Sequence, residues 1–134
     1  MTTTERGKLQ LETDDNNKHT IIFKPVNNTV WMNKAELVEF FGVYIQTINS
    51  HVEAVYRTKA FREEDTSKYD LYVSGNRIKY DMREFNLEII IALAFRIDSW
   101  QARVLREWVI SEMIRSNSIV EYPLSGEEQN HLLN

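Results

Sequence analysis

Gly42 separates two stretches that each have the periodicity of a short helix, and this arrangement limits the fold more than any other feature of the chain. Asn33 followed three residues later by Glu36 forms a capping box that begins the first helix. Gly42 comes directly after the last apolar residues of that helix, where a left-handed residue ends a helix without a steric clash. Helical spacing predicts the buried faces as Leu37, Phe40 and Phe41, then Ile45, Ile48, Val52, Val55 and Tyr56.

Two helices joined by so short a turn predict a helix-turn-helix, a unit whose second helix enters the major groove of DNA. The polar residues of the second helix include Gln and Asn, which can pair with an adenine edge. From 33 to 57, however, two basic residues stand against three acidic ones, whereas Lys and Arg supply most non-specific affinity for DNA. A plain helical hairpin is therefore an alternative. The candidate base-reading residues are Gln46, Thr47, Asn49 and Ser50, and the candidate phosphate contacts beside them are Lys34 and Tyr44.

A β-hairpin is predicted shortly after the second helix. Apolar and polar residues alternate on both sides of Gly75-Asn76, a pair that suits a two-residue type II′ turn. A hairpin in this position forms the wing of a winged helix-turn-helix. Arg77 and Lys79 lie at or beside its tip and are candidates to contact phosphate.

The remaining segments predict an α+β fold with a small antiparallel sheet or hairpin and about four helices. Leu9 and Leu11 favour a short strand, and residues 19–23 and 29–32 favour two more that form a small antiparallel sheet. The charged stretch 59–68 is typical of a solvated loop. We expect a flexible amino-terminal segment at 1–18, a single winged helix-turn-helix-like domain at 19–117 that ends in a helical pair, and a mobile tail at 118–134.

The helical pair begins at residues able to cap a helix. Asn86 precedes an almost wholly apolar helix, which should lie at the centre of the core. Asp98 or Ser99 caps the last helix, at about 100–116, whose apolar residues cover more than one stripe. This breadth predicts a second contact surface, which is either the amino-terminal sheet or another subunit in a homodimer formed through residues 100–116.

Composition argues against several other classes of function. The 134 residues include no cysteine, which removes disulfides, thiolate metal sites and cysteine nucleophiles, and fits a cytoplasmic protein. No apolar run approaches the roughly 20 residues of a membrane span. The three histidines lie far apart in the sequence, and the four glycines form no phosphate-binding loop. We therefore expect no enzyme, no catalytic residues, no metal and no cofactor.

Several short segments occur in the order and spacing of a bacterial protein family. They are Thr29-Val30-Trp31-Met32, Leu37-Val38-Glu39-Phe40-Phe41-Gly42-Val43, Thr47-Ile48, His51-Val52, Phe85-Asn86-Leu87-Glu88-Ile89-Ile90, Phe95-Arg96-Ile97-Asp98-Ser99 and Leu105-Arg106-Glu107-Trp108. Together they resemble the RhuM family of virulence-associated proteins, over about residues 20 to 116. The resemblance implies a DNA-binding-like helix-turn-helix with a following hairpin and helical pair, related in style to the amino-terminal domains of phage antirepressor-type proteins and often encoded near mobile elements.

Two hypotheses for function follow. The first is a regulator of transcription that binds double-stranded DNA, with the second helix in the major groove and the hairpin on the backbone. The second is a protein-interaction module that keeps the fold and has lost DNA binding. The net charge of −4 and the acidic residues Glu39 and Glu53 favour the second hypothesis, whereas the resemblance favours the first.

Overall fold

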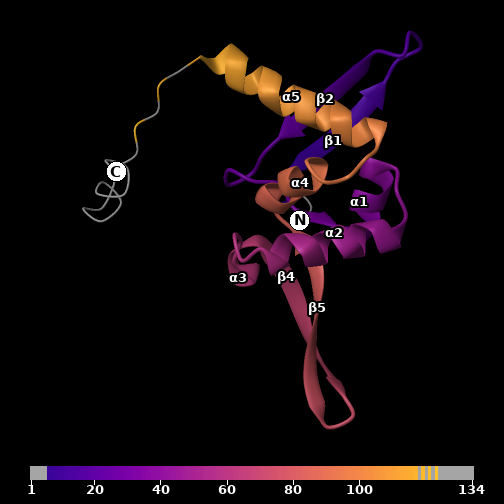
Figure 1. Ribbon diagram of the computed structural model, residues 1–134, viewed down its shortest axis with the longest axis vertical. Helices are drawn as coiled ribbons and strands as arrows, with labels where there is room; N and C mark the ends of the chain where they lie inside the picture. Colours follow the sequence, from indigo (N-terminus) through magenta and orange to yellow (C-terminus); the bar gives the residue numbers. More distant parts are fainter. Residues whose placement is uncertain (1–5, 118, 120, 122, 124–134) are drawn as a thin grey trace.

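The structure is a computed structural model that describes residues 6–117, 119, 121 and 123, so most of the tail expected at 118–134 lies outside the described residues. The chain folds as α+β (Figure 1). In chain order the elements are β1 (Lys8–Thr13), β2 (His19–Lys24), β3 (Met32–Asn33), α1 (Lys34–Phe41), α2 (Ile45–Arg57), α3 (Glu63–Thr66), β4 (Ser67–Ser74), β5 (Arg77–Phe85), α4 (Leu87–Ala94) and α5 (Trp100–Ser116).

Local signals set the bounds of α1. The Asn33 side chain accepts a hydrogen bond from the Glu36 amide at 2.8 Å, and the Glu36 carboxylate accepts one from the Asn33 amide at 2.8 Å. This is the predicted capping box. Gly42 ends the helix with φ 64°, ψ 40°, as predicted, and its amide donates to the Val38 carbonyl. A Cβ built on Gly42 would collide with the end of the Gln101 side chain of α5, so a larger residue would force that flexible side chain to move in addition to straining the backbone.

The strands form two separate sheets. β1 and β2 pair antiparallel from Lys8 opposite Lys24 to Thr13 opposite His19. The second sheet has the order β3-β5-β4, and the β4–β5 hairpin turns at Gly75, whose φ of 65° fits the first central residue of a type II′ turn. Figure 1 shows this hairpin projecting from the body of the molecule, at the opposite end from the β1–β2 ribbon.

Three expectations about the strands and the charged stretch were wrong. The short strand predicted at Leu9 and Leu11 is confirmed as β1, and Leu9 is buried in the core, so residues 8–13 are not part of a flexible segment 1–18. Residues 1–5 of that segment lie outside the described residues. The strand expected at 29–32 is limited to β3, and it pairs with β5 instead of joining an amino-terminal sheet. The stretch 59–68 includes one turn of helix, α3, which a 2.8 Å hydrogen bond between Tyr56 Oη and Thr66 Oγ1 ties to α2.

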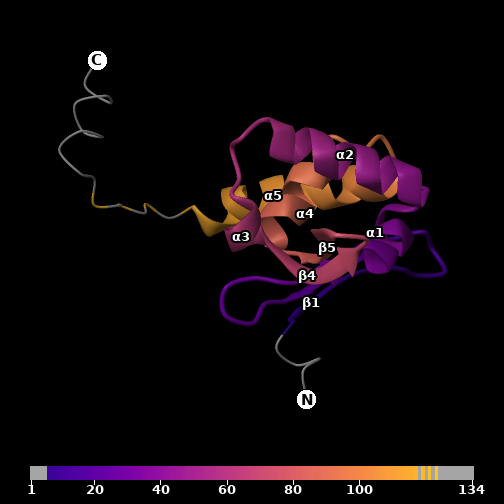
Figure 2. The same ribbon diagram turned by 90° about the horizontal axis from the view of Figure 1, so that it is seen from below.

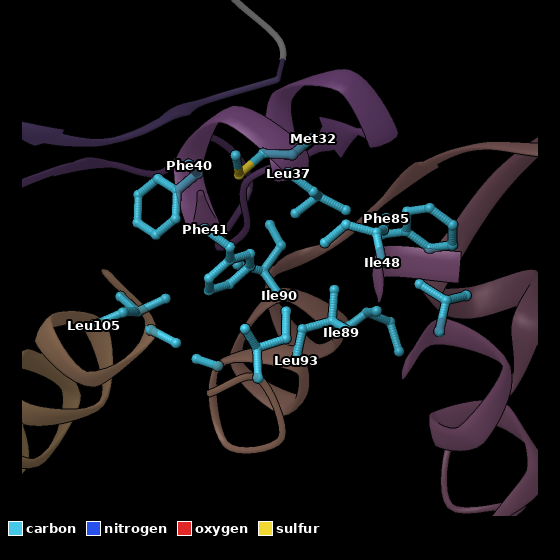
Figure 3. Packing of buried hydrophobic residues seen from close by; sticks show 14 of the residues in the cluster. Met32, Leu37, Phe40, Phe41, Ile48, Phe85, Ile89, Ile90, Leu93 and Leu105 are labelled. Carbon is cyan, nitrogen blue, oxygen red and sulfur yellow. The ribbon is translucent and has the colours of Figure 1, made fainter. Parts of the chain in front are cut away.

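The core lies between the helices. Its largest fully buried side chains come from both halves of the chain: Phe41, Phe85, Leu37, Ile48, Ile89, Ile90, Leu93, Ile97, Leu105 and Val30 (Figure 3). Figure 1 shows α4 between α2 and α5, consistent with its nearly all-apolar sequence. The predicted buried face of α2 is confirmed for four residues, but Ile45 is 41% exposed because it is the first residue of the helix and lies past the edge of the core.

The amino-terminal ribbon supplies the second contact surface of α5. Trp108 packs edge to face against Phe23 of β2, and Trp100 lies 4.7 Å from His19, measured between ring centroids. Arg106 Nη1 donates to the carbonyls of Ala94 and Ile97 at 2.7 and 3.2 Å, and so satisfies the end of α4. In the described part of the chain, no helix has both the length and the apolar content needed to cross a membrane.

Candidate nucleic-acid interface

The outward side of α2 carries an uncharged polar surface. Gln46, Asn49 and Ser50 are exposed, and Thr47 is half-buried. We call these four residues the α2 ridge. Their orientation follows from the sequence, because apolar residues at intervals of three and four turn the other side of the helix into the core.

The beginning of α2 is open to solvent. Tyr44 holds the N-cap position in an extended conformation and is 82% exposed. It forms no side-chain hydrogen bond to the first amides of the helix. Free amides and the positive end of the helix dipole favour an anion such as phosphate at this position. The Tyr44 ring therefore lies beside a helix end that favours an anion.

A hollow of about 440 Å³ lies along one flank of α2. We call it the α2 hollow. Figure 2 shows the β4–β5 hairpin on this side of α2, with β1 beyond the hairpin. The lining comes from the start of α1, from α2, from the connection to α3, and from α3 and β5. It consists of Lys34, Asn49, Val52, Glu53, Tyr56, Arg57, Lys59, Glu63, Tyr80 and Met82.

The cations of the α2 hollow are not fully neutralised by its two carboxylates. Arg57 Nη2 lies 3.4 Å from Glu53 Oε1 in an exposed pair. The Tyr80 hydroxyl donates to Glu63 Oε1 at 3.1 Å, and this hydrogen bond together with the carboxylate charge raises the pKa of Tyr80. Within residues 6–117, Lys34 and Lys59 form no salt bridge. Two lysines therefore remain available to a negatively charged partner.

The basic residues of the hairpin lie apart from this group. Arg77 pairs with Ser74 and Lys79 with Tyr72 across the two strands, so all four share one face. Tyr80 of the hollow lies on the opposite face, although the ribbon twists toward its tip (Figure 1). Both basic side chains are exposed, and neither has an acidic partner among the described residues. The predicted site residues thus form two groups, one around α2 and one at the hairpin tip.

Arg57 and Lys59 line the α2 hollow but are not among the site residues predicted from the sequence. Arg57 follows Asn49 by eight residues and Glu53 by four, so helical spacing alone would have placed it on the same flank. Lys59 lies beyond the end of α2, in a left-handed conformation with φ 64°. Its place in the hollow depends on the packing of α3, which the sequence did not indicate.

Other features of the described chain are separate from the α2 ridge. A larger hollow of about 850 Å³ lies among β1, α1 and the start of α5, and includes none of the predicted site residues. In the part of the chain that is described, no three His, Cys, Asp or Glu side chains gather as the ligands of a metal ion would.

Comparison of the chain with protein-family models, curated proteins and solved structures gives no match. The resemblance to the RhuM family therefore stays a prediction. The fold itself is α+β with small antiparallel sheets, and the geometry of α2 and the hairpin is the basis for any assignment of function.

Proposed function

We propose that this protein binds double-stranded DNA as a winged helix-turn-helix of the RhuM-like type. In this proposal α2 enters the major groove, and the β4–β5 hairpin acts as the wing. The observation that carries the proposal is the exposed, uncharged α2 ridge at the outer surface of a helix that follows a tight glycine turn. A role in regulating transcription, linked to mobile elements, belongs to the same proposal.

The roles of the side chains follow from their chemistry. Gln46 and Asn49 carry amide groups that match the donor and acceptor of an adenine edge. Lys34 and Lys59 have no acidic partner among the described residues and are suited to phosphate, as are Arg77 and Lys79 at the hairpin tip. The other residues of the ridge, Thr47 and Ser50, offer hydroxyl groups, and the Tyr44 hydroxyl can reach the backbone.

Binding of labelled genomic DNA fragments at a series of salt concentrations tests this proposal. Each phosphate contact adds about 0.9 to the slope of log affinity against log salt, so Arg77→Glu with Lys79→Glu should lower the slope by about 2. The affinity should fall for all sequences alike, because phosphate contacts carry no base information.

A matched control comes from the other ribbon. Lys8 and Lys24 are cross-strand partners on β1 and β2, and neither forms a salt bridge among the described residues. Lys8→Glu with Lys24→Glu changes the net charge by the same amount on the β1–β2 ribbon, which lies apart from the β4–β5 hairpin (Figure 1). It should leave the salt slope nearly unchanged. Failure of the wild-type chain to retain any fragment at low salt would refute the proposal.

The second candidate function is binding to a protein partner. Glu39 is exposed, and Glu53 is exposed beside the α2 ridge, where a carboxylate opposes DNA. Under this alternative, a purified partner would protect residues 46–50 from hydrogen exchange, and the chain would not retain DNA at any salt concentration.

A further inference from the structure

One face of the β4–β5 hairpin is apolar along its whole length. Residues directly opposite each other in an antiparallel pair lie on the same face, and the pairs here are Tyr69 with Met82, Leu71 with Tyr80, and Val73 with Ile78. We call these six residues the apolar hairpin face. The charged residues of both strands, such as Lys68, Asp70, Lys79 and Asp81, lie on the opposite face.

This face is largely uncovered. Met82, at the base, packs against the core, whereas the other five are exposed: Tyr69 45%, Leu71 68%, Val73 73%, Ile78 77% and Tyr80 52%. The Tyr69 and Tyr80 rings pack edge to face, with their centroids 5.4 Å apart, and so form one continuous surface. A two-stranded hairpin is marginally stable in water unless its apolar face packs on something. A partner surface would therefore stabilise the part of the hairpin that projects beyond β3 and the core.

We propose that two copies of this chain associate through their apolar hairpin faces. The two hairpins pack face to face about a two-fold axis, and the strands of one copy lie against those of the other at the usual spacing of packed sheets, about 10 Å. Tyr80 and Met82 also line the α2 hollow, so the base of this interface adjoins the candidate DNA site. No contact with DNA is needed to form it, so the inference goes beyond DNA binding and does not depend on it.

The area available fits a dimer. A whole aromatic side chain has an area of about 150–250 Å², and a whole aliphatic one somewhat less. Multiplied by the five exposed fractions, these areas give roughly 600 Å² of exposed surface per copy. Two copies then bury roughly 1,200 Å², the lower limit of the range for specific interfaces. The exposed apolar residues toward the end of α5, Ile110, Met113 and Ile114, offer a smaller area than these five.

The chemistry of the face matches a second copy of itself. An interface about a two-fold axis brings each patch against the same patch, so any charge would meet a like charge. None of the six residues is charged, and the polar atoms among them are the two tyrosine hydroxyls. One of these, on Tyr80, already donates to Glu63. The six residues themselves therefore bring no charge into the interface, and the Glu63 carboxylate lies beside Tyr80 as its hydrogen-bond acceptor.

The mass of the full chain in solution tests the proposal. At about 100 μM, above the micromolar range expected of a small interface, the wild-type chain should have twice the monomer mass of 15.9 kDa. Leu71→Lys with Ile78→Lys should halve the measured mass. Both positions are exposed, so circular dichroism should show an unchanged fold.

The opposite face supplies the matched control. Tyr72→Lys with Ser74→Lys adds the same two charges to the same hairpin and should leave the dimer intact. The absence of cysteine from the chain allows a second readout. Ile78→Cys should react slowly with a thiol reagent in the dimer, whereas Tyr72→Cys should react as an exposed thiol.

Four outcomes would overturn the proposal. They are a wild-type chain that is monomeric at this concentration, a Leu71→Lys, Ile78→Lys chain that still dimerises, and a dimer that is lost instead in Met113→Lys with Ile114→Lys. The fourth is binding of a monomeric wild-type chain to phosphatidylcholine vesicles, which would assign the face to a lipid surface.

Discussion

Replacing Gly42 with alanine tests whether the turn between α1 and α2 requires glycine for two separate reasons. The first reason is the backbone, because φ is +64° and a residue with a Cβ in the left-handed region loses about 1–2 kcal/mol. The second is space, because the new Cβ would lie 2.3 Å from Gln101 Nε2 and 2.9 Å from Cδ. Moving the end of that side chain to another rotamer costs about 0.5–1.5 kcal/mol.

The two terms together predict that Gly42→Ala lowers the free energy of unfolding by about 1.5–3.5 kcal/mol, out of a total of about 5–15 kcal/mol. Equilibrium unfolding in urea measures this loss. With a slope of about 1–3 kcal/mol per molar, the midpoint should fall by roughly 0.5–3.5 M while the slope itself stays constant.

Two further variants separate the terms. Gly75 has φ +65°, and nothing lies within 4 Å of the point that a Cβ would occupy there, so Gly75→Ala carries the backbone cost alone. Gln101→Ala combined with Gly42→Ala removes the collision and should recover about 0.5–1.5 kcal/mol relative to the sum of the single changes. An unchanged midpoint in Gly42→Ala, or full additivity in the double variant, would refute the reasoning.

Two other changes test the core and the helix ends. Arg106→Gln removes the charged donor that satisfies the carbonyls at and just beyond the end of α4, and should lower the free energy of unfolding by about 1.5–3 kcal/mol. The control is Arg103→Gln, on the exposed side of α5, which should change the free energy of unfolding by less than about 0.5 kcal/mol. Equal losses in the two variants would contradict the role of Arg106. Burial raises the pKa of Tyr56, so the folded chain retains the phenolic proton after the unfolded chain has lost it. The contribution of Tyr56 is fully present below its ordinary pKa of 10.0 and is lost as the pH rises through the higher folded value. The difference in free energy of unfolding between the wild type and Tyr56→Phe, measured in urea, should therefore be smaller above pH 10 than at pH 8. An equal difference at the two pH values would contradict the raised pKa of Tyr56.

The sequence predicted those parts of the fold that depend on local signals. Asn33, Glu36 and Gly42 define α1 through a capping box and a left-handed end, both within ten residues, and the structure confirms them. The cap at Ser99 and the bounds of α5 are confirmed in the same way. Such signals act between neighbours in the chain, so they can be read without knowledge of the packing.

The errors concern contacts between distant segments. β3 pairs with β5 across about fifty residues, and Leu9 is buried by elements that follow it in the chain. The alternation of Leu71 and Val73 correctly predicted a strand, yet alternation is usually a sign of a half-buried face, and here both residues are exposed.

In the candidate site, likewise, the features set by local periodicity could be predicted, and those set by packing could not. The exposure of Gln46, Asn49 and Ser50 follows from the period of α2 alone. The grouping of Lys34 with Lys59 in the α2 hollow depends on how α1 and α3 pack on α2, and no local pattern in the chain indicates that packing.

Selection of binding sites from random double-stranded DNA, with the wild-type chain and with Gln46→Ala, Asn49→Ala, tests the proposed role of the α2 ridge most directly. The proposal predicts an enriched motif for the wild type. It also predicts that the variant loses discrimination at one or two base pairs, by about 1–3 kcal/mol each, and keeps its affinity for unrelated DNA. Enrichment of no motif, or of the same motif by both proteins, would contradict the placement of α2 in the major groove.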